Sequence, residues 1–475
     1  MRLSALTDTS GGADEAIVTG FAIDHRKVAP GTIFGAFEGA RVNGEDFIPA
    51  AIEAGAVAVV ARPEARVEGA LHIADYSPRE RFAKLAARFF APFPAKTVAV
   101  TGTNGKTSTV EMTRQLWRMA GHHAASIGTL GVTTADERVV TGLTTPDVVT
   151  FLSNVAGLAR EGVTHLAFEA SSHGLSQYRT EGLRVAAAAF TNLSRDHLDY
   201  HGDMAAYFTA KLRLFSEVLA DDGTAVVWAD DPQSERVIDL ARERGNRVLT
   251  VGEHGDDLRL VSRAPTLLGQ GLVVATSDGT EHRVNLPLIG GYQAANALLS
   301  AALVIATGGE SGATLAGLAR LQPVRGRLER AAIATSGAPI YVDYAHTPDA
   351  LEAAVAALRP HVAGRLILVF GAGGDRDQGK RAPMGKVAAN QADVVIVTDD
   401  NPRGEDAAAI RRDVLEGAPG ATEIGDRRAA IAHAVEIARA DDIVLVAGKG
   451  HEQGQIVGDM VLPFDDVAVA REVAA

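Results

Sequence analysis

Short runs of β-branched and other apolar residues recur along the chain, and a Gly-rich or polar turn follows each run. Ala-rich segments with helical character separate many of these runs. This alternation is typical of helices layered on a sheet, so it predicts α/β domains with mostly parallel strands. The strands that we expect most clearly span residues 97–100, 165–168, 186–190, 224–228, 340–343, 366–370, 394–398 and 443–446.

Two breaks in this pattern predict domain boundaries. Pro92 and Pro94 close a helical stretch just before a strand, and proline disfavours continuation of a helix. The stretch 321–330 separates an Ala-rich helix, expected at 294–307, from the next strand. We therefore expect three domains, at residues 1–95, 96–325 and 326–475, as the length of 475 residues also suggests at roughly 150 residues per domain.

Composition and charge narrow the class of protein. The chain is 47% hydrophobic and 22% charged, which is ordinary for a globular protein and excludes wholesale disorder. Its formal net charge is −13 without long basic runs, so we expect neither nucleic acid nor an anionic membrane as a partner. Anionic ligands must then be bound by local cations and by backbone N–H groups.

The absence of cysteine excludes disulfides, thiolate nucleophiles, iron–sulfur clusters and thiolate zinc sites. It also suits a reducing compartment. Residues 1–20 lack the apolar centre of a signal peptide, and no stretch approaches the roughly 18 apolar residues of a membrane span. We expect a cytoplasmic protein.

The segment 98–109 reads as a strand, a glycine turn and the start of a helix. Backbone N–H groups at such a turn bind phosphate, Lys106 has the reach for the β- and γ-phosphates, and Thr107 is placed to ligate magnesium. The usual first glycine of this motif is replaced by Val100, so the match is a variant, and a plain strand-turn-helix also often contains glycine. The predicted nucleotide-binding residues are Gly102, Thr103, Asn104, Gly105, Lys106, Thr107 and Ser108.

Two further strands deliver candidate metal ligands to the same sheet edge. Glu169 follows the strand at 165–168, and a loop rich in Asp and His, with His197 in it, follows the strand at 186–190. Magnesium prefers oxygen ligands, so Glu169 is a natural ligand and His197 a less usual one. Taken alone, Asp196, His197, Asp199 and His201 also fit a plain polar loop. Taken alone, Lys211, on a helix expected around 207–215, is ordinarily solvated or ion-paired.

Taken together, these residues resemble the Mur ligase family of ATP-dependent amide-forming enzymes, and within it the members that add meso-diaminopimelate in peptidoglycan synthesis. The motifs carrying the resemblance run from about residue 20 to 466. They are Thr101-Gly-Thr-Asn-Gly-Lys-Thr107, Thr144-Thr-Pro146, Glu169-Ala-Ser-Ser-His-Gly-Leu175, Thr191-Asn-Leu-Ser-Arg-Asp-His-Leu-Asp199, Lys211-Leu-Arg-Leu-Phe215, Asp343-Tyr-Ala-His-Thr-Pro-Asp349, Gly371-Ala-Gly-Gly-Asp-Arg-Asp377, Asp400-Asn-Pro-Arg403 and Gly448-Lys-Gly-His-Glu452.

The resemblance implies an N-terminal domain for the uridine nucleotide, a central P-loop-type ATPase and a C-terminal Rossmann-like domain for the incoming amino acid. It implies Mg²⁺, ATP as co-substrate, and a carbamate derived from CO₂ on Lys211. A carbamate turns the cation into a carboxylate-like ligand, so the implied metal ligands are Thr107, Glu169, His197 and carbamylated Lys211. We expect a monomer with these small-molecule substrates.

The resemblance also implies further contacts, residue by residue. Asn296, Arg327, Asp343 and His346 would contact ATP. Thr144, Thr145, Ser171, Gln177 and Arg179 would hold the muramoyl peptide, although a surface loop also accounts for the last two. At the uridine site, the family usually has Asp-Ser-Arg where this chain has Asp24-His25-Arg26, which leaves His25 as the candidate contact.

The C-terminal motifs would form the amino-acid pocket. Two arginines after adjacent strands suit bidentate binding of carboxylates, and an unpaired buried arginine would reject lysine, which lacks the second carboxylate of diaminopimelate. A dinucleotide-binding glycine motif at 371–374 is excluded by the spacing of the glycines and by the charged residues after it. The implied pocket residues are Arg376, Asp400, Asn401, Pro402, Arg403, Gly448 and Glu452.

The implied reaction phosphorylates the D-glutamate γ-carboxylate of UDP-N-acetylmuramoyl-L-alanyl-D-glutamate, and the amine of meso-diaminopimelate then attacks the acyl phosphate. Lys106, His197 and Lys211 are the implied catalytic residues, acting with two magnesium ions. Three alternatives stay open: the same ligase adding L-lysine or another diamino acid, a folylpolyglutamate synthetase, and a nucleotide-gated ATPase that forms no bond.

Overall fold

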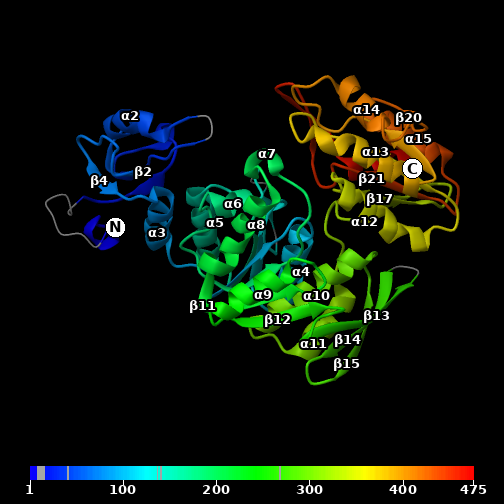
Figure 1. Cartoon of the computed structure of the whole chain (residues 1–475), viewed down its shortest axis with the longest axis horizontal. Coiled ribbons are helices and arrows are strands. Elements are labelled where there is room, and N and C mark those ends of the chain that lie inside the picture. The colour runs from blue at the N-terminus through cyan, green and yellow to red at the C-terminus, as the bar shows by residue number, and fades with distance from the viewer. Residues whose placement is uncertain (8–15, 40–41, 136, 140–141, 267–268) are drawn as a thin grey trace.

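The computed structural model describes residues 1–7, 16–39, 42–135, 137–139, 142–266 and 269–475. Its strands form three main sheets that follow one another along the chain, and a small sheet of β22 (Gly454–Val457) and β23 (Met460–Pro463) lies near the C-terminal end. The N-terminal unit and the C-terminal unit lie on opposite sides of a central unit (Figure 1). The expected three-part, mostly parallel α/β architecture is confirmed, whereas the domain boundaries at 95 and 325 stay predictions.

The N-terminal unit is built on a parallel sheet in the order β1-β2-β3-β4. Apolar side chains from both faces of β2 and β3 are buried, among them Phe34 and Val59. Phe82 of α3 packs on this sheet in a core that continues into the central unit, so α3 joins the two units. The elements are α1 (Ser4–Thr7), β1 (Gly20–Ala22), η1 (His25–Lys27), β2 (Thr32–Gly35), η2 (Gly44–Phe47), α2 (Ile48–Glu53), β3 (Ala56–Ala61), β4 (Leu71–Ala74) and α3 (Pro78–Phe90).

The central unit has an eleven-stranded sheet in the order β15-β14-β13-β12-β11-β10-β5-β9-β6-β7-β8. Its strands are β5 (Lys96–Thr101), β6 (Ala124–Gly128), β7 (Gly131–Thr133), β8 (Arg138–Val139), β9 (His165–Glu169), β10 (Val185–Phe190), β11 (Leu219–Trp228), β12 (Arg247–Gly252), β13 (Leu258–Thr266), β14 (Gly269–Thr276) and β15 (Glu281–Leu286). From β6 to β13 neighbouring strands are parallel, while both ends of the sheet are antiparallel.

The strand order places β5 at a topological switch point. After β5 the chain moves to one side for β6 and β9, and it then crosses to the other side for β10, β11 and β12. In open α/β sheets, ligands bind outside the carboxyl ends of the strands at such a point. The loop after β5 is therefore the position where the fold favours a ligand.

Helices cover both faces of the central sheet. Helices α4 and α10 bury one face, with Val98 and Val100 of β5 in that core, while α5 and α8 bury the other face, which Phe168 and Phe190 fill. The helical elements are α4 (Lys106–Met119), α5 (Val148–Arg160), α6 (Ser172–Ser176), α7 (Leu198–His201), α8 (Met204–Arg213), η3 (Leu214–Val218), α9 (Ser234–Glu243), α10 (Gly291–Ala306), α11 (Ser311–Gly317) and η4 (Leu318–Arg320).

The C-terminal unit has a six-stranded sheet in the order β16-β17-β21-β18-β19-β20, parallel except for β16 at one edge. Apolar residues of α12, α13 and α14 cover one face, and those of α15 and α16 cover the other. The elements are β16 (Glu329–Ile333), β17 (Pro339–Asp343), α12 (Pro348–Leu358), η5 (Arg359–His361), β18 (Leu366–Phe370), η6 (Gln378–Lys380), α13 (Arg381–Gln391), β19 (Val394–Val397), α14 (Ala407–Leu415), β20 (Thr422–Glu423), α15 (Arg427–Ile437), β21 (Ile443–Ala447), β22 (Gly454–Val457), β23 (Met460–Pro463) and α16 (Asp466–Ala474).

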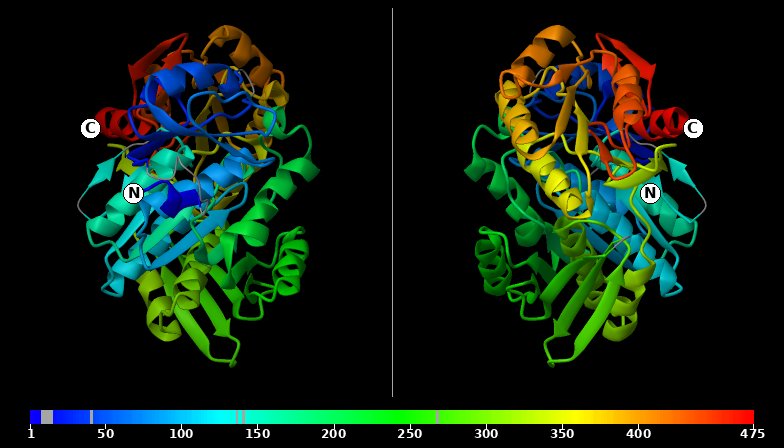
Figure 2. Two further views of the ribbon diagram at one scale, coloured as in Figure 1. Left: turned by 90° about the vertical axis from the view of Figure 1, so that its left-hand side faces the viewer. Right: turned by 90° about the vertical axis from the view of Figure 1, so that its right-hand side faces the viewer.

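All eight strands expected from the sequence are present, seven of them with ends shifted by at most one residue, whereas β11 begins at Leu219, five residues before the expected start. Two details of the expected organisation are wrong. Helix α11 and the turn η4 intervene after α10, and β16 already begins at Glu329, inside the stretch taken as a connection. Among the described residues, no helix is long and apolar enough to cross a membrane. The side views in Figure 2 show the β13–β15 strands projecting at the end of the molecule away from the N-terminal unit.

Candidate active site

The turn between β5 and α4 can be built only from glycine at two positions. Gly102 and Gly105 have φ values of +142° and +88°, in the region that L side chains rarely adopt. A Cβ on Gly102 would lie 1.8 Å from Thr191 Oγ1, and one on Gly105 would lie 2.4 Å from Asn296 Oδ1. The turn thus brings backbone N–H groups to the start of α4, where a phosphate is favoured.

The side chain of Lys106 folds back onto this turn. Its ammonium donates to the carbonyl oxygens of Gly102 at 2.9 Å and Thr103 at 2.7 Å. Burial lowers the pKa of Lys106, and the carboxylates of Glu169 and Asp196 only partly offset that effect. An anion arriving at the turn would give this lysine a stronger partner than a carbonyl oxygen.

A cavity of about 530 Å³ lies against this turn and collects most of the predicted nucleotide and metal residues. It lies between the central unit and the start of the C-terminal unit. Of the predicted residues, His25, Gly102, Thr145, Gln177, Arg179 and the whole amino-acid set do not line it. The predicted residues in its lining are Thr103, Asn104, Gly105, Lys106, Thr107, Ser108, Thr144, Glu169, Ser171, His197, Lys211, Asn296, Arg327, Asp343 and His346.

Glu169 lies at the carboxyl end of β9 and is only 2% exposed. The N–H of Thr129 donates to its Oε1 at 2.6 Å, and the Thr129 hydroxyl donates to its Oε2 at 3.1 Å. A Cβ on Gly128 would lie 2.2 Å from the same carboxylate, so glycine is needed for this approach. The carboxylate is thereby fixed at the cavity wall.

Lys211 is 1% exposed, so the reading of this lysine taken alone, as a solvated or ion-paired side chain, does not hold, and the carbamate that the resemblance implies stays a prediction. Its amine donates to the carbonyl oxygen of Gly102 at 2.7 Å and lies 4.2 Å from the centre of the Tyr207 ring. Burial lowers the pKa of Lys211 well below its ordinary value, and the nearby charge of Lys106 lowers it further. Both effects shift the balance from the ammonium toward the neutral amine.

His197 sits in the loop after β10 with a left-handed backbone, at φ +54°. Its Nε2 lies 3.5 Å from Oδ2 of Asp196. Burial lowers the pKa of His197 to about 4, which the charge of Asp196 only partly offsets. A neutral imidazole at this position retains a lone pair for a ligand or a cation.

The residues that connect to the C-terminal unit reach the same cavity. Arg327 donates to Oγ1 of Thr107 at 3.0 Å, and its guanidinium lies 4.5 Å from the centre of the Tyr344 ring. Asp343 instead accepts from the backbone N–H groups of Leu328 at 2.6 Å and Ala345 at 2.8 Å. Burial raises the pKa of Asp343 to about 6, despite the nearby Arg327 and these N–H groups. Asp343 therefore holds the turn that carries Arg327.

The residues predicted for the muramoyl peptide cluster beside Glu169. Arg179 donates to Gln177 Oε1 at 2.8 Å and to the carbonyl oxygen of Thr145 at 2.7 Å. Thr145 in turn donates to the Glu169 carbonyl oxygen at 2.8 Å and accepts from the Ser171 N–H at 3.1 Å. These hydrogen bonds join Thr145 to the stretch 169–179.

His25 lies apart from this cluster, in the N-terminal unit. Its ring stacks on Phe47 with the ring centres 4.4 Å apart. The preceding Asp24 caps the short helix η1 by accepting from the N–H of Arg26. The structure does not bring His25 together with the residues around Glu169.

The predicted amino-acid residues gather at the carboxyl ends of β18, β19 and β21. Asn401 donates to Glu452 Oε2 at 2.8 Å, and a Cβ on Gly448 would lie 2.5 Å from Asp400 Oδ2. That Asp400 oxygen is buried and has no hydrogen-bond partner among the described residues. Arg403, whose φ is +53°, donates to the carbonyl oxygen of Gly374 at 2.8 Å. An unused buried oxygen and a guanidinium bound only to carbonyls are groups that a charged ligand would satisfy.

Sequence reasoning missed Lys449, which holds this second cluster together. Its ammonium, 0% exposed, donates to Asn401 Oδ1 at 2.9 Å and to Glu452 Oε2 at 3.1 Å. Lys449 lies inside the Gly448–Glu452 motif, but only Gly448 and Glu452 of that motif were assigned a role from the sequence. Asn192 was missed in the same way: its side chain accepts from the N–H of Asn104 at 2.9 Å and so fixes the phosphate loop.

The donor set of the main cavity fits magnesium. No group of three or more His, Asp or Glu side chains among the described residues is arranged to hold a metal. Magnesium, however, keeps several waters and uses one or two protein oxygens together with phosphates. The hydroxyl of Thr107 and the carboxylate of Glu169 supply such oxygens in one cavity.

Family models match most of the chain. The "Mur ligase family, catalytic domain" matches residues 17–112, the "Mur ligase middle domain" residues 100–304, and the "Mur ligase, glutamate ligase domain" residues 326–450.

Named relatives match along the whole length. The chain is 61% identical to the UDP-N-acetylmuramoyl-L-alanyl-D-glutamate–2,6-diaminopimelate ligase of Zymomonas mobilis, over 96% of this chain and 94% of the relative. It is 50% identical to the enzyme of that name from Bradyrhizobium diazoefficiens, over 100% and 99%. A solved structure of a ligase of that name is 33% identical, with a TM-score of 0.74, over 100% and 98%. The chain belongs to the Mur ligase family.

Proposed function

We propose that the protein joins meso-diaminopimelate to the D-glutamate γ-carboxylate of UDP-N-acetylmuramoyl-L-alanyl-D-glutamate, with ATP as co-substrate, in the synthesis of peptidoglycan precursors. The observation that carries this proposal is the cavity in which the phosphate loop, the Glu169 carboxylate and the buried Lys211 amine face one space. The names of the full-length relatives support the choice of both substrates.

The chemistry proceeds through an acyl phosphate. An oxygen of the γ-carboxylate attacks the γ-phosphorus of ATP, and the bond to the β-phosphate oxygen breaks with release of ADP. The amine of diaminopimelate then attacks the activated carbonyl, loses a proton, and the amide forms as phosphate leaves. No covalent bond to the enzyme is needed, so catalysis rests on positioning and on neutralising charge.

Different residues of the cavity would bind the phosphates and the magnesium. The N–H groups of residues 102–108 and Lys106 would hold the phosphates, and Arg327 would bring a second cation to the same end. Thr107, Glu169 and a carbamate on Lys211 would hold Mg²⁺, with His197 completing the set. Bound magnesium would supply charge neutralisation on the phosphate oxygens.

The environment of Lys211 supports the proposed carbamate. The nitrogen lone pair of a neutral amine attacks the carbon of CO₂, a C–N bond forms, one C=O pair moves to oxygen, and a proton leaves. Burial lowers the pKa of Lys211 and so favours the neutral amine that this step needs. The resulting carbamate is an anion next to Lys106, and its charge would neutralise the charge of the Lys106 ammonium.

The second cluster would bind the amino acid. Arg376 and Arg403 would bind carboxylates, and Asp400 and Glu452 the ammonium groups, with Asn401, Pro402 and Gly448 shaping the pocket. Thr144, Thr145, Ser171, Gln177 and Arg179 would hold the peptide of the nucleotide substrate, with His25 near its uridine end. We further propose that the enzyme works as a monomer in the cytoplasm.

Product analysis by mass spectrometry tests the proposal. The enzyme is given ATP, Mg²⁺, the muramoyl dipeptide nucleotide, and equal amounts of meso-diaminopimelate and L-lysine. We expect the diaminopimelate adduct to dominate and phosphate release to require both the nucleotide and the amino acid. A dominant lysine adduct would favour the lysine-adding alternative. Phosphate release without either acceptor would favour an ATPase that forms no bond.

A further inference from the structure

A second cavity, of about 520 Å³, lies at the other end of helix α4 and shares no lining residue with the active-site cavity. The first turn of α4 carries the phosphate-loop residues, whereas its later turns line this second cavity. The remaining walls come from β8 and from the segment that leads to the C-terminal unit. Its lining residues are Glu111, Arg114, Gln115, Arg118, Met119, Arg138, Gln322, Pro323, Val324 and Arg325.

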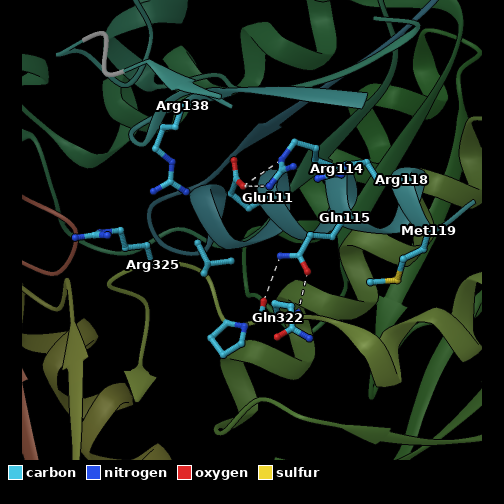
Figure 3. A pocket seen from close by; sticks show the side chains of 10 residues that line it. Glu111, Arg114, Gln115, Arg118, Met119, Arg138, Gln322 and Arg325 are labelled. Carbon is cyan, nitrogen blue, oxygen red and sulfur yellow. Dashed lines mark hydrogen bonds and ion pairs between the residues drawn. The ribbon is translucent and has the colours of Figure 1, made fainter. Parts of the chain in front are cut away.

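The walls of this cavity are strongly cationic. Four arginines and one carboxylate line it, in a protein whose net charge is −13. Arg114 and Arg118 come from α4, Arg138 from β8, and Arg325 from the connecting segment (Figure 3). Arginines from three separate elements thus line one space.

The carboxylate in the wall cannot neutralise this charge. Oε2 of Glu111 accepts from Arg114 at 2.9 Å, and Oε1 accepts a hydrogen bond from Ser126. Within the described ranges, Arg118 and Arg138 have no carboxylate within ion-pair distance. Arg325 is bound to Asp465 of the C-terminal unit. Two guanidiniums therefore remain without an anion.

The positive field extends beyond the cavity wall. Burial lowers the pKa of His451 to about 3, and the charges of Arg327, Arg138 and Arg325 lower it further. The cavity is also held open: the side chain of Gln115 accepts from the Gln322 N–H at 2.8 Å and donates to the Gln322 carbonyl at 3.2 Å. The two hydrogen bonds fix the connecting segment to α4, as Figure 3 shows.

We propose that this cavity is a binding site for a small polyanion that carries at least two adjacent anionic groups. The planar donors of arginine bind phosphate and carboxylate oxygens in pairs, and the volume falls within the roughly 300–1,000 Å³ of small-molecule sites. Met119, Pro323 and Val324 give the cavity an apolar side for an uncharged part of the ligand.

Two elements of the structure connect this cavity to the active-site cavity. The connecting segment that carries Arg325 continues to Arg327, which donates to Thr107 in the phosphate loop. Helix α4 joins the two cavities from the other side. An anion bound between α4 and the connecting segment would hold these two elements together.

Calorimetric titration with inorganic pyrophosphate and, separately, with citrate tests the proposal. Magnesium-free buffer and the Lys106→Ala full-length enzyme remove binding at the phosphate loop. We expect one polyanion to bind this protein at one site, and binding to weaken by roughly tenfold or more in Lys106→Ala/Arg118→Gln/Arg138→Gln. Tighter binding of pyrophosphate would assign a phosphate ligand, and tighter binding of citrate a carboxylate ligand.

Matched variants separate the site from a general effect of charge. Arg259 and Arg283 are exposed on β13 and β15, outside the lining of this cavity, and their replacement by Gln in the same background should leave binding unchanged. In the otherwise native enzyme, Arg118→Gln/Arg138→Gln should retain basal turnover, which shows that it folds. The proposal is overturned if neither anion binds Lys106→Ala, or if the Arg118/Arg138 and Arg259/Arg283 replacements weaken binding equally.

Discussion

At the scale of single residues, the most unusual environment belongs to Lys211. A lysine that is 1% exposed ordinarily needs a carboxylate partner, but this amine donates to a carbonyl oxygen and faces a second lysine. Carbamylation would resolve both problems, since it removes the positive charge and introduces an anion beside Lys106.

Replacement of Lys211 by Ala should lower turnover by roughly a thousandfold or more, because the proposed carbamate would be lost both as a magnesium ligand and as a partner of Lys106. Short carboxylates such as acetate or propionate should restore part of the activity by filling the space of the carbamate. Release of phosphate at fixed ATP and Mg²⁺ is the measurement. Lys386→Ala, on the exposed surface of α13, is the matched control. Normal turnover in Lys211→Ala would contradict the carbamate.

Arg403 should determine the preference for diaminopimelate over lysine. Its guanidinium donates to a carbonyl oxygen at 2.8 Å and has no carboxylate partner in the described parts of the chain. Arg403→Ala should reduce kcat/KM for diaminopimelate by roughly a hundredfold or more, while kcat/KM for lysine changes little. The ratio of the two kcat/KM values is measured in competition.

A control for Arg403 lies nearby. Arg412 is an exposed arginine of α14, and its replacement by Ala should leave that ratio unchanged. An Arg403→Ala enzyme that still discriminates as the native enzyme does would remove Arg403 from the specificity pocket.

Residue roles were predictable where a role follows from local sequence. Gly102 and Gly105 could be placed at the phosphate turn because a helix-opening Gly-Lys-Thr follows a strand. The burial of Lys211 was not predictable, because it depends on Tyr207 and Gly102, and the latter is 109 residues away in sequence. The hydrogen bonds of Lys449 were not predictable for the same reason, because its partner Asn401 lies 48 residues earlier in the sequence.

At the scale of elements, a buried ion pair joins α15 to α16. Arg427 donates to both carboxylate oxygens of Asp466, at 2.8 and 2.7 Å, and both side chains are 0% exposed. The same guanidinium donates to the carbonyl oxygen of Ala447 at 2.9 Å, at the end of β21. This contact fixes the helices to the strand end that leads into Gly448.

Arg427→Met should lower the free energy of unfolding of the C-terminal unit by about 3–5 kcal/mol, because it leaves the Asp466 carboxylate buried without its partner. The double replacement Arg427→Met/Asp466→Leu should recover most of that loss. Urea unfolding followed by circular dichroism measures both.

The neighbouring residue supplies the control for this pair. Arg428 pairs with Glu472, but these side chains are 49% and 64% exposed, so Arg428→Met should cost less than about 1 kcal/mol. Equal losses for Arg427→Met and Arg428→Met would show that burial of the pair is not the cause.

Elements were predictable where a strand is buried on both faces. Such strands, among them β5, β9 and β18, are continuous apolar runs and were found within one or two residues. The antiparallel strands β13 to β15 were not expected, because one face of β13 is exposed and its polar residues interrupt the run. Helix α11 was not predicted from the sequence, because its seven residues are mostly small.

At the scale of the whole molecule, the central and C-terminal units are joined by charged contacts that no local pattern predicts. Arg195 of the central unit lies 3.7 Å from Asp377 of the C-terminal unit, and Arg325 pairs with Asp465. The partners in these two pairs are 182 and 140 residues apart in sequence. Sequence reasoning therefore gave the order of the units but not how they face one another.

Partly buried histidines that stay neutral should make the whole molecule sensitive to acid. Burial lowers the pKa of His173 and His197 to about 4 and that of His451 to about 3, against about 6.5 for an unfolded chain. Below pH 6.5 the unfolded state therefore binds more protons than the folded state, so stability falls as the pH decreases. Asp343 acts in the opposite direction, because its raised pKa of about 6 makes the folded state bind the extra proton between about pH 6 and 4.

Between pH 7.5 and 6 the histidines act almost alone, so the free energy of unfolding should fall by roughly 1–2 kcal/mol, allowing for the exposed part of His197. Urea unfolding at both pH values measures this change. In His451→Gln the decrease should be smaller, because one group that must stay neutral has been removed. His254→Gln, whose parent side chain is 80% exposed, should retain the full decrease. A free energy of unfolding that is equal at the two pH values would contradict the neutral state of these histidines in the folded protein.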